Sequence, residues 1–202
     1  TTGSAPRPIL PSRNPDKIQE LRELLSALNV SLHSMLDFPT IPDVVEDHDT
    51  IFGNAMKKAI HGAQLTGMLC IADDTGLFVD ALNGEPGVYS ARYAGESCSY
   101  LDNRRKLMFK MQDQEVRSAR FCTAIALADP KGIVAVVSST VEGEIVEFER
   151  GSNGFGYDNA FEVQGLGKTY AEMSDDEKNR CSHRSFAIQK ILPILKRVLD
   201  TI

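Results

Sequence analysis

A strand, loop and helix unit near the N-terminus most constrains the fold. The apolar run in residues 8–12 is followed by Asn14-Pro15, where Asn favours a helix N-cap and Pro favours the first helical position. Apolar side chains then recur at the spacing of one helix face, at Ile18, Leu21, Leu24, Leu25 and Leu28. The pattern predicts a strand that leads through a short loop into an amphipathic helix.

The next part of the chain continues this alternation. Residues 30–35 indicate a second strand, which a polar loop separates from a helix over residues 50–66. Residues 68–72 are apolar throughout and predict a buried strand. Glycines and a proline interrupt residues 76–97, so we expect a short strand followed by loops there.

The second half of the chain is richer in strands. Residues 98–112 predict a helix, and residues 117–129 and 132–148 predict two strands joined by the turn sequence Asp129-Pro130-Lys131-Gly132, which is typical of an antiparallel hairpin. A last amphipathic helix is expected over residues 182–200, bent at Pro193. We therefore expect an α/β fold with a mixed β-sheet flanked by helices.

Charge and cysteine usage limit the partners. The net charge of −6 argues against a nucleic-acid or membrane surface, because both require a basic face. No stretch approaches the roughly 20 apolar residues of a membrane span, and nothing in the sequence indicates export. The four cysteines form no CxxC pair, which favours reduced thiols and a cytoplasmic location. Residues 1–7 are expected to be a flexible tail before a single domain over residues 8–202.

Two adjacent acids, Asp73 and Asp74, follow the buried run at residues 68–72. Successive side chains of a strand face opposite ways, so we expect one acid to face a cleft and the other to support it from behind. Carboxylates at the carboxyl end of a strand in an α/β sheet lie where ligands usually bind. An ordinary Asp-rich turn explains the same residues.

The loop after the first strand offers a phosphate cradle. Free backbone N–H groups, a hydroxyl, an amide and a lysine come together in Ser12, Arg13, Asn14, Pro15, Asp16 and Lys17. The glycines of a P-loop are missing, and a well-capped helix with a solvated Lys17 accounts for the residues equally.

Two later segments carry further polar groups. In residues 153–158, glycines flank Phe155, so the backbone can approach a ligand while the ring stacks on a base; a β-bulge or turn also explains these glycines. In residues 175–184, Ser182 can cap the last helix and gather Lys178, His183 and Arg184 near its N-terminus, although a charged surface turn is the usual explanation of such a run. Acids, amides and cations without a nucleophilic Ser or Cys motif favour metal-assisted chemistry on a phosphate ester.

These segments, in this order, resemble the inosine triphosphate pyrophosphatase family, which hydrolyses deaminated purine nucleoside triphosphates. The similarity covers nearly the whole chain beyond the first residues, in the segments 12–17, 54–59, 72–77, 87–95, 153–158, 177–179 and 182–184. The resemblance implies a two-lobed α/β fold with a central nucleotide-binding cleft, a homodimer, magnesium as cofactor, and release of the monophosphate and pyrophosphate from a nucleoside triphosphate.

The same resemblance implies roles for particular residues. Asp74 is the expected catalytic base and a magnesium ligand, with Glu46 as the second ligand. Ser12, Asn14, Lys17 and Lys58 are expected to hold the triphosphate, and Thr75 to lie beside it. The sugar and base pocket is expected to be shaped by Phe155, Gly156, Tyr157, Asp158, Lys178, His183 and Arg184.

Some positions depart from the family pattern. Where the family usually has two Glu residues, this chain has Phe52 and Gly53, which puts any metal or supporting role there in doubt. Asn159-Ala160 replaces the usual Pro-Ile, and Ser185 replaces a Gly. These changes fall beside the expected nucleotide pocket.

Three alternatives stay open at this level. The same chemistry on another nucleotide, such as a pyrimidine triphosphate, fits a similar fold. A phosphatase that forms an aspartyl-phosphate on Asp73 or Asp74 normally has an Asp-x-Asp motif near the first strand, and this chain has none. A non-catalytic nucleotide sensor would have little need to retain Asp74, Glu46 and Lys17 together.

Overall fold

The N-terminal unit forms as predicted. The computed structural model describes residues 8–26, 32–38 and 40–201, and within it β1 (Ile9–Leu10) leads into α1 (Pro15–Ser26). The Asn14 side-chain oxygen accepts hydrogen bonds from the backbone N–H groups of Asp16, at 3.0 Å, and Lys17, at 3.3 Å. Asn14 therefore caps α1 by satisfying donors that have no partner within the helix. The tail predicted at residues 1–7 lies outside the described residues.

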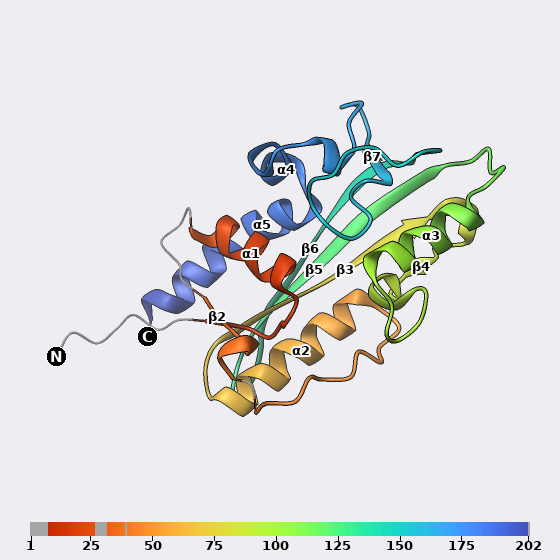
Figure 1. The fold of residues 1–202 in the computed structure, drawn as a ribbon. Helices are drawn as coiled ribbons and strands as arrows, with labels where there is room; N and C mark the ends of the chain where they lie inside the picture. The colour runs from red at the N-terminus through yellow and green to blue at the C-terminus, as the bar shows by residue number, and fades with distance from the viewer. Residues whose placement is uncertain (1–7, 27–31, 39, 202) are drawn as a thin grey trace. The chain divides into compact units, whose positions relative to one another are not determined.

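The strands form one mixed sheet (Figure 1). In the described residues its order is β2-β1-β3-β5-β6-β7, with β4 paired to β3. β1 is parallel to β2 and β3, whereas β4 and β7 pair antiparallel with their neighbours, so the predicted α/β fold with a mixed sheet is confirmed. The further strands are β2 (His33–Ser34), β3 (Cys70–Val79), β4 (Pro86–Gly87), β5 (Ser118–Asp129), β6 (Gly132–Ile145) and β7 (Phe161–Val163).

The hairpin predicted at Asp129–Gly132 is confirmed. Only Pro130 and Lys131 separate β5 from β6, and the two strands are neighbours in the sheet. The Asp129 carboxylate accepts from the backbone N–H groups of Lys131, at 2.8 Å, and Gly132, at 3.2 Å. This is the turn stabilisation that makes Asp favourable at the start of a tight turn.

The longer helices begin at capping residues. α2 (Ile51–Thr66) is capped by Thr50, and α3 (Tyr100–Lys110) by Ser99. α5 (His183–Asp200) starts after Ser182, whose hydroxyl oxygen accepts from Ser185 N at 3.0 Å, so the predicted cap is confirmed. Pro193 lies inside α5, and the bend expected there stays a prediction. Short 3-10 turns occupy η1 (Met35–Asp37), η2 (Asp80–Leu82), η3 (Ser90–Arg92) and η4 (Tyr170–Glu172).

The charged run before Ser182 is a helix rather than a surface turn. α4 (Asp175–Cys181) begins after Ser174, whose hydroxyl oxygen accepts from Glu177 N at 3.2 Å. The Glu177 side chain reaches back toward Ser174, which completes a capping box. The sequence Ser174-Asp175-Asp176-Glu177 has the spacing of a capping box, although its charges are also typical of a surface turn.

The strand that carries the two acids is longer than predicted. Residues 68–72 and a separate short strand were expected, but β3 runs without a break from Cys70 to Val79. Asp73 and Asp74 therefore lie in the middle of a strand, and their expected place at its carboxyl end was wrong. Gly76 does not break β3, because its missing Cβ makes room for β4: a Cβ there would lie 2.7 Å from the Gly87 carbonyl oxygen.

The chain divides into two compact units. The first unit contains the described residues up to Asp74, Ala124–Ser138 and the described residues from Phe186 onward; the second contains Thr75–Thr123 and Ser139–Ser185. β3 passes from the first unit to the second between Asp74 and Thr75. The single two-lobed domain and its central cleft stay predictions.

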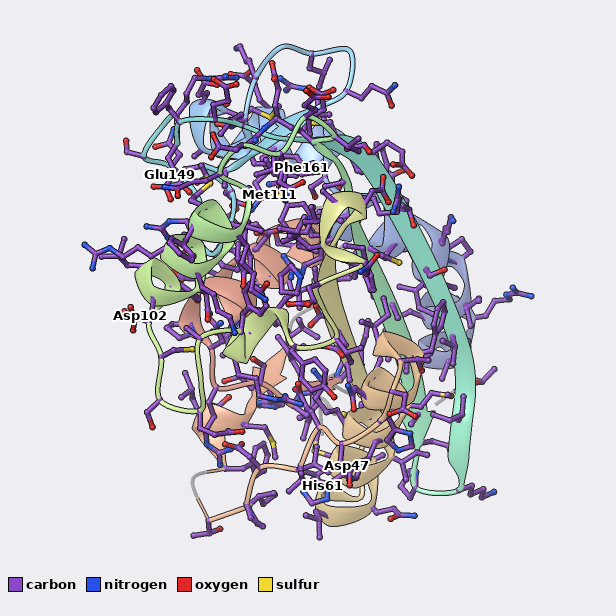
Figure 2. The ribbon with its side chains drawn as sticks, turned by 90° about the vertical axis from the view of Figure 1, so that its right-hand side faces the viewer. Asp47, His61, Asp102, Met111, Glu149 and Phe161 are labelled. Atoms are coloured by element: carbon purple, nitrogen blue, oxygen red, sulfur yellow. The ribbon has the colours of Figure 1, made fainter. Side chains whose placement is uncertain are left out.

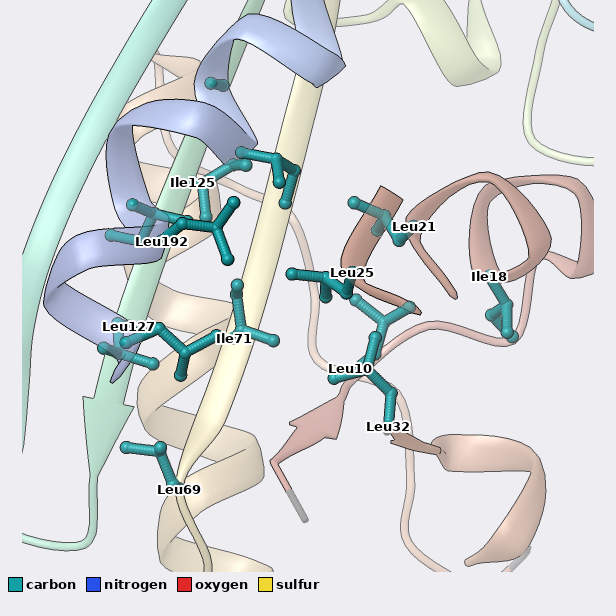
Figure 3. Close-up of a cluster of buried hydrophobic side chains, with 14 residues drawn as sticks. Leu10, Ile18, Leu21, Leu25, Leu32, Leu69, Ile71, Ile125, Leu127 and Leu192 are labelled. Carbon is teal, nitrogen blue, oxygen red and sulfur yellow. The ribbon is translucent and has the colours of Figure 1, made fainter. Parts of the chain in front are cut away.

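The core of the first unit is aliphatic (Figure 3). Strand side chains Leu10, Ile71, Ile125 and Leu127 pack in one cluster with residues of α1 and α5. α2 lies on the other side of β3 (Figure 1), where Gly62 lets it approach so closely that a Cβ would lie 2.7 Å from Cys70 Sγ. Burial of this aliphatic cluster holds α1 and α5 against β3, and the contact at Gly62 brings α2 against Cys70 of the same strand.

The core of the second unit is aromatic. The Phe121 and Phe161 rings meet edge to face with centroids 4.7 Å apart, and Tyr170 stacks on Phe161 at 5.7 Å. The His183 ring stacks on Phe121 at 4.6 Å. Rings in these arrangements add attraction beyond the area they bury. Among the described residues, no helix combines the length and apolarity needed to cross a membrane.

Gly143→Ala should destabilise the second unit. Gly143 pairs with Val163 of β7, and a Cβ there would meet the Glu162 carbonyl oxygen and the Phe161 ring. Overpacking against backbone costs about 1–3 kcal/mol, which urea denaturation can measure. Thr140→Ala at an exposed position of the same strand is the control, expected to stay within about 0.5 kcal/mol of the wild type. Equal free energies of unfolding for the two variants would contradict this packing.

Candidate functional site

Two groups of predicted site residues lie in the two units. The carboxylate–lysine cluster of the first unit consists of Lys17, Glu46, Lys58, Asp73 and Asp74. The aromatic–cation cluster of the second unit consists of Phe155, Asp158, Lys178 and Arg184.

Lys58 of α2 is the centre of the carboxylate–lysine cluster. Its buried ammonium donates to the backbone carbonyl of Asp73 at 2.6 Å. The same nitrogen lies 3.0 Å from Glu46 Oε1 and 3.8 Å from Asp74 Oδ1. Burial alone would lower the pKa of Lys58, but the carboxylates of Asp74, Glu46 and Asp73 outweigh it and raise the pKa above its ordinary value. Lys58 is therefore charged and partly neutralises the acids around it.

The two adjacent acids face apart, as strand alternation predicts. Asp73 Oδ1 lies 3.5 Å from Lys17 Nζ of α1, whereas Asp74 lies beside Lys58 of α2. Figure 1 shows α1 and α2 on opposite sides of β3. Both carboxylates are buried, Asp73 with 3% and Asp74 with 6% of its surface exposed. The difference in chemical role between them stays a prediction.

Asp74 has a strongly perturbed pKa. Burial raises the pKa of Asp74 to about 6; the charges of Lys58 and Lys17 oppose the shift, and Glu46 and Asp73 add to it. A carboxyl group that titrates near neutrality can both accept and hold a proton at physiological pH. Asp74 is thus suited to act as a general base.

The raised pKa of Asp74 predicts a pH-dependent stability difference. The folded pKa of about 6 exceeds the ordinary 3.8, so ionisation of Asp74 costs stability as the pH rises from about 4 to 7. Asp74→Asn avoids this cost and should gain up to roughly 2–3 kcal/mol over the wild type across that range, because one pKa unit corresponds to about 1.4 kcal/mol. Urea denaturation at several pH values in a metal chelator measures the gain, and a pH-independent difference would contradict it.

Glu46 lies in a loop that α2 holds in place. The Asn54 side-chain oxygen accepts from His48 N at 3.0 Å, and Lys57 pairs with Asp47 at 2.7 Å. Figure 2 shows Asp47 beside α2 and near His61, a residue of that helix, and His61 Nε2 is 3.0 Å from the Pro42 carbonyl oxygen. These contacts position the loop that places Glu46 on Lys58.

The departures from the family pattern in α2 have structural consequences. Gly53 makes room for the His48 ring, since a Cβ at Gly53 would lie 2.7 Å from its Nδ1. Phe52 is exposed to solvent. Gly53 therefore lets His48, in the loop that carries Glu46, pack against α2.

The residues of the predicted phosphate loop also make contacts that stabilise the fold. Ser12 Oγ accepts from Asn14 N at 3.2 Å, and Asn14 caps the helix that Pro15 and Asp16 begin. The Arg13 guanidinium binds Asp43 at 2.6 Å and the carbonyl oxygens of Phe38, at 3.1 Å, and Ile41, at 2.6 Å. The predicted helix cap is confirmed, but Lys17 is not solvated as that interpretation assumed, because its ammonium lies 3.5 Å from Asp73 Oδ1 and 17% of its side chain is exposed. The phosphate cradle stays a prediction.

The aromatic–cation cluster gathers residues from three segments. Asp158 Oδ2 pairs with buried Lys178 Nζ at 2.7 Å and accepts from Phe155 N at 3.0 Å. Lys178 Nζ lies 4.7 Å from the centre of the Phe155 ring, and the Arg184 guanidinium carbon lies 5.7 Å from it. Two cations at one ring make this an electropositive site with a flat apolar surface.

Gly156 and Tyr157 hold the segment 153–158 to other residues of the second unit. The buried Tyr157 hydroxyl donates to the Ser90 carbonyl oxygen at 2.6 Å, and burial raises its pKa well above the ordinary value. The Gly156 carbonyl accepts from Arg104 at 3.0 Å. At two departures from the family pattern, Asn159 Nδ2 lies 3.3 Å from Glu149 Oε2, and the Ser185 hydroxyl donates to the Ser182 carbonyl at 2.9 Å.

Thr123 is a site residue that the sequence reasoning missed. Its hydroxyl lies 2.8 Å from the Thr75 hydroxyl and 2.6 Å from His183 Nδ1, and Arg184 donates to Thr75 at 3.1 Å. Thr123 immediately precedes the apolar run of residues 124–128 and has no exposed surface. A buried hydroxyl requires a hydrogen-bond partner, so a threonine next to an apolar strand was the sequence signal that could have identified Thr123.

The fold and the two clusters define an α/β protein whose buried lysine and carboxylates suit a polyphosphate, and whose aromatic ring and cations suit a planar base. The chain belongs to the Ham1 family, whose sequence model matches residues 9–194. This family membership agrees with the resemblance found in the sequence.

Relatives and solved structures support this assignment over most of the chain. The chain is 42% identical to the dITP/XTP pyrophosphatase of Desulfotalea psychrophila, with 92% of this chain and 83% of that protein covered, and 44% identical to the enzyme of the same name from Geobacter sulfurreducens, with 90% and 92% covered. It resembles the structure of the Staphylococcus aureus Ham1 protein with a TM-score of 0.83 at 37% identity, covering 94% and 98% of the two chains. A dITP/XTP pyrophosphatase from Mycobacterium abscessus matches with a TM-score of 0.74 at 40% identity, covering 93% and 99%.

Proposed function

We propose that this protein hydrolyses deaminated purine nucleoside triphosphates, such as inosine, deoxyinosine and xanthosine triphosphates, to the monophosphate and pyrophosphate, and so cleanses the nucleotide pool. Relatives that cover at least 90% of the chain bear the name dITP/XTP pyrophosphatase, in agreement with the enzyme class predicted from the sequence. The alternatives, a pyrimidine triphosphate substrate or an aspartyl-phosphate phosphatase, have no support among these relatives.

The observation that carries the proposal is the carboxylate–lysine cluster. A buried charged lysine, Lys58, lies between Glu46 and Asp74, and Lys17 stands at Asp73 on the other face of the strand. Lysines supply the positive charge that a triphosphate needs in an acidic protein. Asp74 supplies a proton acceptor with a pKa near neutrality that can orient water toward the α-phosphorus.

The donor set of the cluster fits magnesium. Glu46 and Asp74 present carboxylate oxygens to the same ammonium group, and oxygen is the ligand atom that magnesium prefers. Within the described ranges, no three His, Cys, Asp or Glu side chains are grouped to hold a metal by themselves. When bound, Mg²⁺ would neutralise charge on the phosphates. Glu46 and Asp74 would hold it.

The aromatic–cation cluster suits the purine base. Phe155 offers a face for stacking, and the cations of Lys178 and Arg184 lie at the same ring. Donors from Lys178, His183 or Arg184 match the oxygen at the purine 6-position and leave the amino group of adenine without an acceptor. Guanine carries the same oxygen, so its exclusion depends on the 2-position.

A panel of substrates tests the proposal. The protein with Mg²⁺ is incubated with inosine, xanthosine, guanosine and thymidine triphosphates, and kcat/KM is measured for each. The highest values are expected for the inosine and xanthosine substrates. Preference for thymidine triphosphate would instead support the pyrimidine alternative.

Assembly and location complete the proposal. A homodimer is implied by the family resemblance, and light scattering on the purified protein tests it. The cysteines are free thiols in the described chain, consistent with the proposed cytoplasmic location.

A further inference from the structure

A series of hydrogen-bonded side chains in the second unit connects Arg184 to His183 through two threonines. Arg184 Nη2 donates to Thr75 Oγ1 at 3.1 Å, Thr75 Oγ1 lies 2.8 Å from Thr123 Oγ1, and Thr123 Oγ1 lies 2.6 Å from His183 Nδ1. Thr123, His183 and Arg184 are all buried. Thr123 is the link between Thr75 and His183 in this series.

The guanidinium of Arg184 fixes the direction of the first hydrogen bond in this series. A guanidinium only donates hydrogen bonds, so Thr75 Oγ1 accepts from Arg184. Thr75 can then donate its own hydroxyl hydrogen to Thr123, and Thr123 can donate to His183 Nδ1. In this arrangement each hydroxyl accepts one hydrogen bond and donates the next, which is the order in which successive bonds strengthen one another.

The His183 ring is held in one orientation. It stacks on Phe121 with an angle of 20° between the rings, and it meets Tyr170 at 64°. His183 is also the first residue of α5. With the ring held in this orientation, what it can bind depends on which of its nitrogens carries the proton.

We propose that Thr123 is a positioning residue that keeps His183 in the Nε2–H tautomer. If Nδ1 accepts from Thr123, Nε2 must carry the proton and can only donate. This inference rests on the proposed function, in which His183 belongs to the base pocket. A donor at Nε2 binds the 6-oxygen of a deaminated purine and offers nothing to the 6-amino group of adenine. Thr123 thereby contributes to base selectivity without touching the substrate.

Nitrogen-15 NMR of the full chain tests the tautomer directly. The chain has four histidines, and the His183 signals are identified by their loss in His183→Asn. The wild type is expected to show a pyridine-type Nδ1 and a pyrrole-type Nε2. Thr123→Val, which keeps the shape and removes the hydroxyl, should shift His183 toward the other tautomer, whereas Thr123→Ser should keep the wild-type pattern.

Selectivity supplies the second readout. The ratio of kcat/KM for inosine triphosphate to that for adenosine triphosphate should fall by about tenfold in Thr123→Val and be retained in Thr123→Ser, since one misplaced hydrogen-bonding group costs about that factor. A merely structural role would lower both kcat/KM values without changing their ratio.

The outcomes separate this inference from the proposed function. A pyrrole-type Nδ1 in the wild-type protein overturns the inference even if Thr123→Val fails to fold. An unchanged selectivity ratio in a folded Thr123→Val variant overturns it as well. A wild-type protein without pyrophosphatase activity overturns the proposed function, while the NMR result still decides the tautomer.

Discussion

Asp74→Asn is expected to lower kcat by about a thousandfold while the protein remains folded. The substitution keeps the size of the side chain but removes the proton acceptor and a carboxylate ligand, and general-base catalysis is worth roughly 10²–10⁴ in rate. Folding should persist because the buried carboxylate, with its pKa raised to about 6, is itself a cost to stability near neutral pH. Steady-state kinetics with inosine triphosphate and Mg²⁺, together with circular dichroism, measure both effects.

Asp73→Asn is the matched control. Asp73 is equally buried on the same strand, but its side chain faces Lys17 on the other side of β3. We expect kcat to fall by less than about tenfold, since the Asp73 side chain faces away from Glu46 and Asp74, the proposed metal ligands. Comparable losses of kcat in the two variants would contradict the assignment of the chemical step to Asp74.

Lys58→Met is expected to destabilise the protein by about 3–5 kcal/mol at pH 7.5. Removal of this buried cation leaves Glu46 and Asp74 close together without their shared counter-charge, and leaves the Asp73 carbonyl without its donor. The loss should be smaller at pH 5, where Asp74 is mostly protonated. It should also shrink in the double variant Lys58→Met/Asp74→Asn, because the two positions interact directly.

The neighbouring lysine provides the comparison. Lys57 pairs with Asp47 at 2.7 Å in a more exposed position, so Lys57→Met should cost less than about 1 kcal/mol. Urea denaturation of the three variants and the wild type gives the four free energies of unfolding. If Lys58→Met and Lys57→Met cost the same, Lys58 does not hold the carboxylates in the way the distances indicate.

Local signals predicted most of the fold. The Asn14-Pro15 helix start and the Asp129–Gly132 hairpin act through neighbouring residues, so the sequence alone indicates them. The length of β3 could not be predicted this way. Gly76 is typical of a strand break, and only its pairing partner Gly87 shows that it instead permits a close approach of two strands.

The same contrast holds for the candidate site. Alternation along the strand predicted that Asp73 and Asp74 face apart, which the pairing with Lys17 and Lys58 confirms. Thr123 was not found, because its partners lie 48 and 60 residues away along the chain. The sequence likewise did not indicate that Arg13 pairs with Asp43, and the predicted role of Arg13 in substrate binding stays a prediction.

Product identification tests the proposed reaction most directly. Wild-type protein and Asp74→Asn are incubated with inosine triphosphate and Mg²⁺, and the first products are resolved by ion-exchange chromatography and phosphorus-31 NMR. Hydrolysis at the α-phosphorus predicts inosine monophosphate and pyrophosphate in equal amounts from the wild type, and almost none from the variant. Inosine diphosphate and orthophosphate as the first products would contradict a pyrophosphatase.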